Sequence, residues 1–169
     1  MSKYTESECA FTKIPHLLEA LTAIQHPCRQ KGQSWSEKEI EVHLENNPKN
    51  EKLKDRIKKK YPDMKVALDG PVQLHGYHGD KRKQKANVVI PKHYVQGSAN
   101  DIGFMVTKDG TNQCISEFDS GQFNEKWQDR LKDEYGFAEF KKKCRKEGWK
   151  YVEKRLDDGE PRLIIDNPT

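Results

Sequence analysis

The chain has 169 residues, and 31 Lys and Arg against 27 Asp and Glu leave a formal net charge of only +4. Leu, Ile, Val and Phe total 33 residues, a proportion close to that of disordered chains, but disorder also requires a large net charge. The composition therefore indicates one ordinary folded domain, and no apolar run approaches the roughly 18 residues that a membrane span needs.

The first predicted elements are a strand and a helix. Residues 4–12 have the alternating pattern of a strand, and Pro15 suits the first turn of a helix that ends at His26-Pro27. The apolar stripe of this helix consists of Leu17, Leu18, Leu21 and Ile24.

Residues 29–65 carry the whole net charge of the chain, with eleven Lys and Arg against seven Asp and Glu. Ser36 and Glu39 have the spacing of a capping box, which predicts an acidic helix over residues 36–46. A basic helix follows over residues 50–61. The segment is therefore predicted to be a charged helical hairpin inserted into a neutral domain.

The rest of the chain shows strand signals, then helix signals, then a final hairpin. Asp109-Gly110 is a strong hairpin turn, and two helical stretches beginning near Trp127 end at Gly148. The predicted strands cover residues 65–68, 72–77, 86–90, 102–107, 113–118, 149–155 and 162–166. The sequence thus predicts a single α+β domain over residues 1–169, with an antiparallel sheet, helices packed on one face and the inserted hairpin at 29–65.

Two basic clusters are candidate binding sites. One is on the predicted basic helix, and the other is at a predicted hairpin tip over residues 79–85, beside aromatic rings that stack on nucleic-acid bases. The candidate residues are Arg56, Lys58, Lys59, Lys60, Tyr77, His78, Lys81, Arg82, Lys83 and Lys85. The alternative is that both clusters are solvated surface, as most charge runs are. A third cluster at residues 141–146 fits the polar face of an amphipathic helix.

No motif predicts catalysis, a cofactor or a metal site. His75 and His78 lie three apart, so on a strand they point to opposite faces and do not converge on one ion, with or without Cys114 or His93. Cys28 follows His26-Pro27, and the two would act as nucleophile and base only if folding brought them into hydrogen-bond reach. The four cysteines are far apart in sequence, which favours a reducing compartment.

Three motifs resemble one known family: Gly76-Tyr77-His78-Gly79, Ala86-Asn87-Val88-Val89-Ile90 and Asp101-Ile102-Gly103-Phe104. Over about residues 1–26 and 66–167 the chain resembles the hypothetical chloroplast reading frame thirty-five family, a domain of unknown function of plastids, cyanobacteria, other bacteria and phages. Two features depart from that family: residues 29–65 stand where it has a short link, and Asn100 precedes Asp101, whereas the family's aspartate is commonly preceded by Tyr.

The resemblance implies a fold and a binding role, because family genes often neighbour one for an AAA-type ATPase. We therefore expect an intracellular adaptor that acts by protein–protein interaction, with such an ATPase as the partner class. The expected compartment is the cytoplasm, or the plastid stroma or infected-cell cytoplasm for a plastid or phage gene. The alternative function is binding of nucleic acid or nucleotide phosphate through the two basic clusters.

Overall fold

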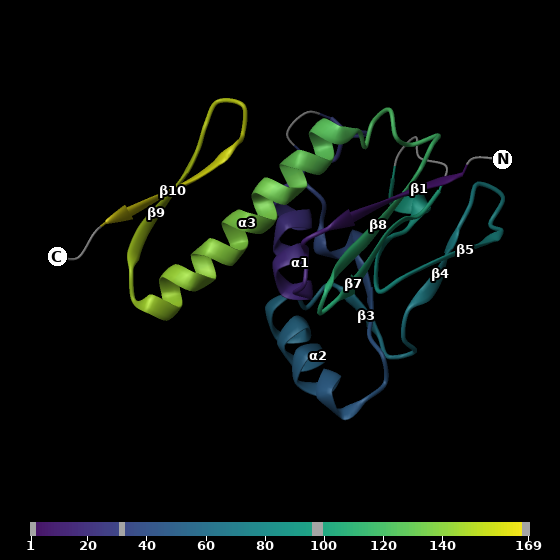
Figure 1. The fold of residues 1–169 in the computed structure, drawn as a ribbon, viewed down its shortest axis with the longest axis horizontal. Coiled ribbons are helices and arrows are strands. Elements are labelled where there is room, and N and C mark those ends of the chain that lie inside the picture. Colours follow the sequence, from purple (N-terminus) through teal and green to yellow (C-terminus); the bar gives the residue numbers. More distant parts are fainter. Residues whose placement is uncertain (1–2, 31–32, 96–99, 167–169) are drawn as a thin grey trace.

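The computed structural model describes residues 3–30, 33–95 and 100–166, and its centre is a mixed β-sheet (Figure 1). In these residues the sheet has six strands in the order β1-β8-β7-β6-β2-β3. Neighbouring strands are antiparallel except β2 and β3, which are parallel. In that order the strands span Tyr4–Cys9, Gly110–Ser116, Ile102–Thr107, Val88–Ile90, Glu41–His43 and Lys65–Ala67.

Three helices of the described chain, α1 (Ile14–Ala23), α2 (Pro48–Lys60) and α3 (Glu125–Glu147), cover one face of this sheet. Each helix buries an apolar stripe against the side chains that the strands direct to that face. The resulting core includes Leu17, Ile57, Leu131, Val88, Phe104 and Ile115. Gly148, with φ at 72°, ends α3 in the left-handed conformation, as the sequence predicted.

A hairpin of β4 (Val72–His75) and β5 (Lys81–Ala86) packs on the opposite face. Leu74 and Ala86 are fully buried there. Gly103 of β7 allows this close approach, because a Cβ atom on it would lie 2.6 Å from Leu74 Cδ1 and 2.9 Å from Ala86 Cβ. The glycine of the Asp-Ile-Gly-Phe motif is thus a packing requirement.

The chain closes with β9 (Lys150–Arg155) and β10 (Pro161–Asp166), which form a separate two-stranded sheet beside α3 (Figure 1). This is the final hairpin that the sequence predicted from the strands at residues 149–155 and 162–166. A second short feature is the 3-10 turn η2 (Lys92–Tyr94) before β7.

The helical hairpin predicted for residues 29–65 is wrong in its first half. Residues Glu37–Glu39 form only a 3-10 turn, η1, and β2 follows it. The capping-box contact exists, since the Ser36 N–H donates to Glu39 Oε2 at 2.8 Å, but it caps this turn and no helix.

The strand forms because every second side chain is apolar and buried. Ile40, Val42 and Leu44 are at most 3% exposed, and their period of two places all three on the core side of β2. The spacing of Ile40 and Leu44 also fits one face of a helix, which is compatible with the helix predicted from the capping box. Tertiary packing between β6 and β3 decided for the strand.

The second helix of the predicted hairpin exists as α2. Asn47 caps it, accepting from the N–H groups of Lys49 at 3.1 Å and Asn50 at 3.2 Å, so the helix begins two residues before the predicted start at residue 50. Because α2 joins β2 to β3, it provides the crossover that parallel strands need.

The α+β class is confirmed, although the sheet is mixed and not purely antiparallel. The two helical stretches predicted after Trp127 are one helix, since Gly136 lies inside α3 without ending it. In the described ranges no helix combines the length and the apolar character that a membrane crossing requires.

Replacing Gly103 with Ala should destabilise the fold, because the new methyl group collides with Leu74 and Ala86. We expect a loss of about 1–3 kcal/mol in the free energy of unfolding, measured by chemical denaturation. Gly136→Ala is the matched control, since nothing lies within 4 Å of a Cβ there. Equal denaturation midpoints for Gly103→Ala and the wild type would contradict this account of the packing.

Candidate binding groove

A groove of about 960 Å³ opens between the end of α1, the first half of α3 and the turn that joins β9 to β10. Its apolar part is formed by Ala23, Ile24, Pro27 and Trp127. Trp127 is held in place because its Nε1 donates to the Gln25 carbonyl oxygen at 3.3 Å. An apolar floor with polar groups around it is typical of binding sites.

Acidic side chains dominate the lining of this groove. The carboxylates are Glu125, Asp129, Asp133, Glu134, Asp158 and Glu160, and the basic residues are Lys126, Arg130 and Arg155. Six against three leave a formal charge of −3 in a chain whose total is +4. This site was not predicted from the sequence, although acids at positions 125, 129 and 133 recur every four residues and so share one face of a helix.

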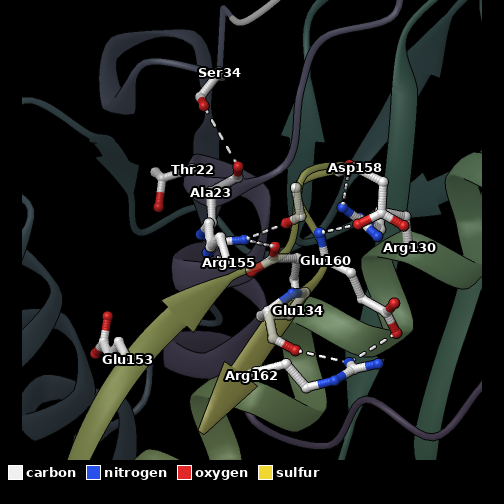
Figure 2. A network of polar contacts seen from close by, with 12 residues as sticks. Thr22, Ala23, Ser34, Arg130, Glu134, Glu153, Arg155, Asp158, Glu160 and Arg162 are labelled. Atoms are coloured by element: carbon white, nitrogen blue, oxygen red, sulfur yellow. Dashed lines mark hydrogen bonds and ion pairs between the residues drawn. The ribbon is translucent and has the colours of Figure 1, made fainter.

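An ion pair between a buried carboxylate and a partly exposed guanidinium holds the turn of the hairpin over the groove. Glu134 of α3 is 3% exposed, and both its oxygens accept from the guanidinium of Arg155 of β9, with Nη2 to Oε2 at 3.1 Å (Figure 2). Arg155 Nη1 also donates to the Gly159 carbonyl at 3.0 Å. Hydrogen bonding to Glu134 and the charges of Glu134 and Glu153 raise the pKa of Arg155, so the guanidinium keeps its charge.

Two further lysine and arginine contacts fix the hairpin along α3. Arg130 Nη2 donates to the Asp158 carbonyl at 2.9 Å. Lys141, which is only 8% exposed, lies 3.3 Å from Glu153 Oε1 of β9 and 3.0 Å from Glu19 Oε1 of α1. Charged groups of α3 therefore contact both β9 and the turn between β9 and β10. These contacts fix the position of the hairpin wall of the groove.

The predicted basic helix is α2, and Arg56, Lys58, Lys59 and Lys60 are all exposed on it. The Lys60 ammonium lies 3.9 Å from Glu19 Oε2 of α1, whose other oxygen binds Lys141 of α3. Glu19 therefore lies between basic residues of α2 and α3.

The third basic cluster of the sequence meets α2 in space. Partial burial and the charges of Lys13, Arg56, Lys146 and Arg145 lower the pKa of Lys142. Cations from the start of α1, from α2 and from the end of α3 thus share one region. From the sequence, residues 141–146 were predicted only as the polar face of an amphipathic helix.

The remaining predicted residues lie on the β4–β5 hairpin, at the right of Figure 1, whereas α2 lies at the bottom. The predicted binding residues therefore fall into two separate groups. The predicted tip at residues 79–85 is corrected, because the turn covers residues 76–80 and Lys81–Ala86 is strand β5. Lys81, Lys83 and Lys85 are exposed along β5.

The turn of this hairpin presents two exposed aromatic rings. Tyr77 is 67% exposed and meets His78 edge to face, with ring centroids 4.9 Å apart. Lys92 fixes the turn, since its Nζ donates to the carbonyl oxygens of Gly76 and Tyr77, each at 3.0 Å. Arg82 is turned inward, with Nη1 3.3 Å from Asp80 Oδ2.

Asp101 ties this hairpin to the sheet. Its Oδ2 accepts from the His75 N–H at 2.7 Å, and its Oδ1 accepts from the Lys92 N–H at 2.8 Å. The Tyr4 hydroxyl donates to the Asp101 carbonyl at 2.8 Å. Both amide partners lie outside the turn that contains Asp101, since His75 belongs to β4 and Lys92 to η2.

His26 and Cys28 do not form an activated pair. The Cys28 N–H donates to His26 Nδ1 at 3.0 Å, while the thiol contacts Gln122. Burial and the Arg29 charge lower the pKa of His26 to about 4, and burial and Asp119 raise that of Cys28 to about 11. A nucleophilic cysteine needs a depressed pKa, so this geometry favours structural roles for both residues.

The side chains of His75 and His78 do not converge to form a metal site. His75 Nδ1 lies 3.2 Å from Asp101 Oδ2, and His78 lies in the exposed turn. Among the residues that the structure describes, no three His, Cys, Asp or Glu side chains gather as metal ligands would.

Comparison with known families identifies the family of this chain. A family model described as a protein of unknown function (DUF1257) matches residues 61–164, from the end of α2 into β10. The match covers more than half of the chain, and the chain belongs to this family. Comparisons with curated proteins and with solved structures gave no match.

Replacing Arg155 with Leu should destabilise the fold, because the buried Glu134 carboxylate loses its partner. Since Arg155 itself is 43% exposed, we expect a cost of about 2–3 kcal/mol in the free energy of unfolding, below that of a fully buried pair. Glu134→Leu together with Arg155→Leu should recover part of this loss in a double-mutant cycle.

The matched control is Lys132→Leu, which removes a cation from an exposed pair on α3. That change should cost no more than about 1 kcal/mol. An Arg155→Leu protein as stable as the Lys132→Leu protein would show that the ion pair does not anchor the hairpin.

Proposed function

We propose that the protein is a non-enzymatic binding module that takes a basic segment of a partner protein into the groove. The observation that carries this proposal is the excess of carboxylates around an apolar floor. Asp129 and Asp133 line the groove and are exposed on α3, so they are available to cations from outside. Lysine or arginine side chains would meet these carboxylates, while apolar residues between them would contact the floor.

The partner class and the cellular setting are part of the proposal. We propose membership of the hypothetical chloroplast reading frame thirty-five family on the motifs at residues 76–79, 86–90 and 101–104. The gene neighbourhood of that family makes an AAA-type ATPase the first partner to test. The four cysteines are free thiols, which supports a reducing compartment such as the cytoplasm.

Binding can be measured by fluorescence anisotropy with labelled short peptides that alternate Lys or Arg with Leu. We expect the wild type to bind them and to reject peptides in which Glu replaces the cations. Asp129→Lys with Asp133→Lys should weaken binding about tenfold or more, because attraction becomes repulsion at the groove.

Asp63→Lys with Asp109→Lys is the matched control. Both residues are exposed and lie outside the groove. Because each double variant replaces two Asp with two Lys, the change in net charge is the same. Equal loss of binding in the two double variants would show that overall charge, and not the groove, attracts the peptide. The same variants, used as bait for the ATPase, test the partner class.

The second candidate function is binding of nucleic acid or nucleotide phosphate, favoured by the convergence of α2 with the end of α3. Lys13, at the start of α1, and Arg56 of α2 lie near Lys142 of α3. Burial and the charges of these two residues contribute to lowering the pKa of Lys142. A surface of this kind attracts phosphates and releases their counterions.

Anisotropy titrations of short single- and double-stranded DNA and RNA at two salt concentrations test this function. Binding should weaken steeply with salt, and Arg56→Glu with Lys142→Glu should abolish it. Lys81→Glu with Lys83→Glu is the control, since both residues are exposed on the distant β5. Loss only in the β5 variant would move the site to that hairpin, and binding that is independent of salt would reject an electrostatic site.

A further inference from the structure

The outer side of the C-terminal hairpin carries two apolar side chains, between charged ones, that nothing in the described residues covers. Side chains alternate along each strand, and those of Tyr151, Glu153 and Arg155 point toward α3, with which Glu153 and Arg155 form ion pairs. Val152 and Ile164 lie on the other side, directly opposite each other. They are 56% and 47% exposed.

The outer edge of β10 also has backbone groups that no residue of the described chain pairs. The Leu156 N–H donates to the Glu160 carbonyl at 2.9 Å, which sets the phase of the ladder. Because hydrogen-bonded and non-hydrogen-bonded pairs alternate, Ile164 directs its N–H and C=O toward β9. The N–H and C=O groups of Leu163 and Ile165 therefore point away from β9. In the described chain β10 pairs with β9 alone, so no strand pairs with these groups.

We propose that β10 pairs with β10 of a second copy of this chain, antiparallel and with the two-fold axis at Ile164. In this register Leu163 faces Ile165 of the second copy, and these residues exchange the outward hydrogen bonds. The two hairpins then form one four-stranded sheet. Val152 and Ile164 of both copies form a continuous apolar row across its outer side.

Charge complementarity supports a second copy as the occupant. The same register places Arg162 opposite Asp166 of the second copy, and the symmetry makes this pair twice. Within one chain Arg162 lies opposite Lys154 and Asp166 opposite Lys150, so β10 carries both a cation and an anion on the outer side. Arg162 also binds Glu160 Oε1 at 2.9 Å, and Asp166 of the second copy would join that cluster.

Other symmetric registers fit less well. An axis at Leu163 places Pro161 in a hydrogen-bonded position, where it has no N–H to donate. Pairing β9 with itself sets like charges opposite each other: Lys150 and Lys154 for an axis at Val152, two Glu153 side chains for an axis at that residue, and two Lys154 side chains for the next. The β10 edge centred on Ile164 avoids both defects.

This inference does not rest on the proposed function of the groove, and its test is the mass of the full chain in solution. Sedimentation equilibrium over a range of concentrations should show twice the mass of one chain at high concentration. Arg162→Asp should raise the dimer dissociation constant about tenfold or more, since Asp would then face Asp166 twice. Arg162→Asp with Asp166→Arg should restore the dimer, because the pairs form again with reversed signs.

A cysteine substitution tests the axis itself. Residues in a non-hydrogen-bonded antiparallel pair have Cα atoms about 4.5 Å apart, within the range that a disulfide spans. Ile164→Cys should therefore form a disulfide-linked dimer under mild oxidation, seen on a non-reducing gel. Val152→Cys is the matched control, because two strands would separate its copies by roughly 14 Å at 4.7–4.9 Å per strand spacing.

Several results would overturn the proposal. One is a single-chain mass at every concentration, which would leave the edge to a strand from another protein or to solvent. Others are a double charge reversal that stays monomeric while circular dichroism shows it folded, or equal cross-linking at positions 152 and 164. A dimer with all variants unchanged would place the interface elsewhere and would equally reject this register.

Discussion

The ion pair between Glu134 and Arg155 is the interaction on which the outer part of the structure depends. A two-stranded hairpin has little stability of its own, because each strand has only one neighbour. In this protein the hairpin is positioned by α3 through this pair and through Lys141 and Glu153. The groove and the direction of the β10 edge both follow from that position, since the hairpin forms one wall of the groove and carries the edge.

The charges of the chain are distributed so that the surfaces differ in sign. The groove lining is acidic, whereas α2 and the end of α3 gather basic residues around Glu19. The net charge of the chain is therefore small although its surface has local electrostatic fields of opposite sign. It is these local fields, and not the net charge, that attract charged partners. This arrangement allows a basic protein segment and an anionic ligand to be distinguished by the variants described above.

Much of the fold was predictable where local signals agreed with packing. The α1 stripe, the Asp109-Gly110 turn, the Gly148 helix end and the closing hairpin follow from short-range rules, and all of them appear. The prediction failed at Ile40, Val42 and Leu44, whose pattern satisfies both a helix and a strand. Such a choice depends on neighbours distant in sequence, here β6 and β3. The groove was missed because acids spaced four apart usually mark only a solvated helix face.

By itself the sequence determined the α+β class, the positions of the basic residues along the chain and the motifs at residues 76–79, 86–90 and 101–104. Only the tertiary structure decided which charges meet, because that depends on contacts between segments far apart in the chain. It separated the β5 lysines from α2, joined α2 to the end of α3, and assigned Asp101 to the amides of His75 and Lys92. It also explains Gly103, because Leu74 and Ala86 occupy the space that a side chain at this position would need.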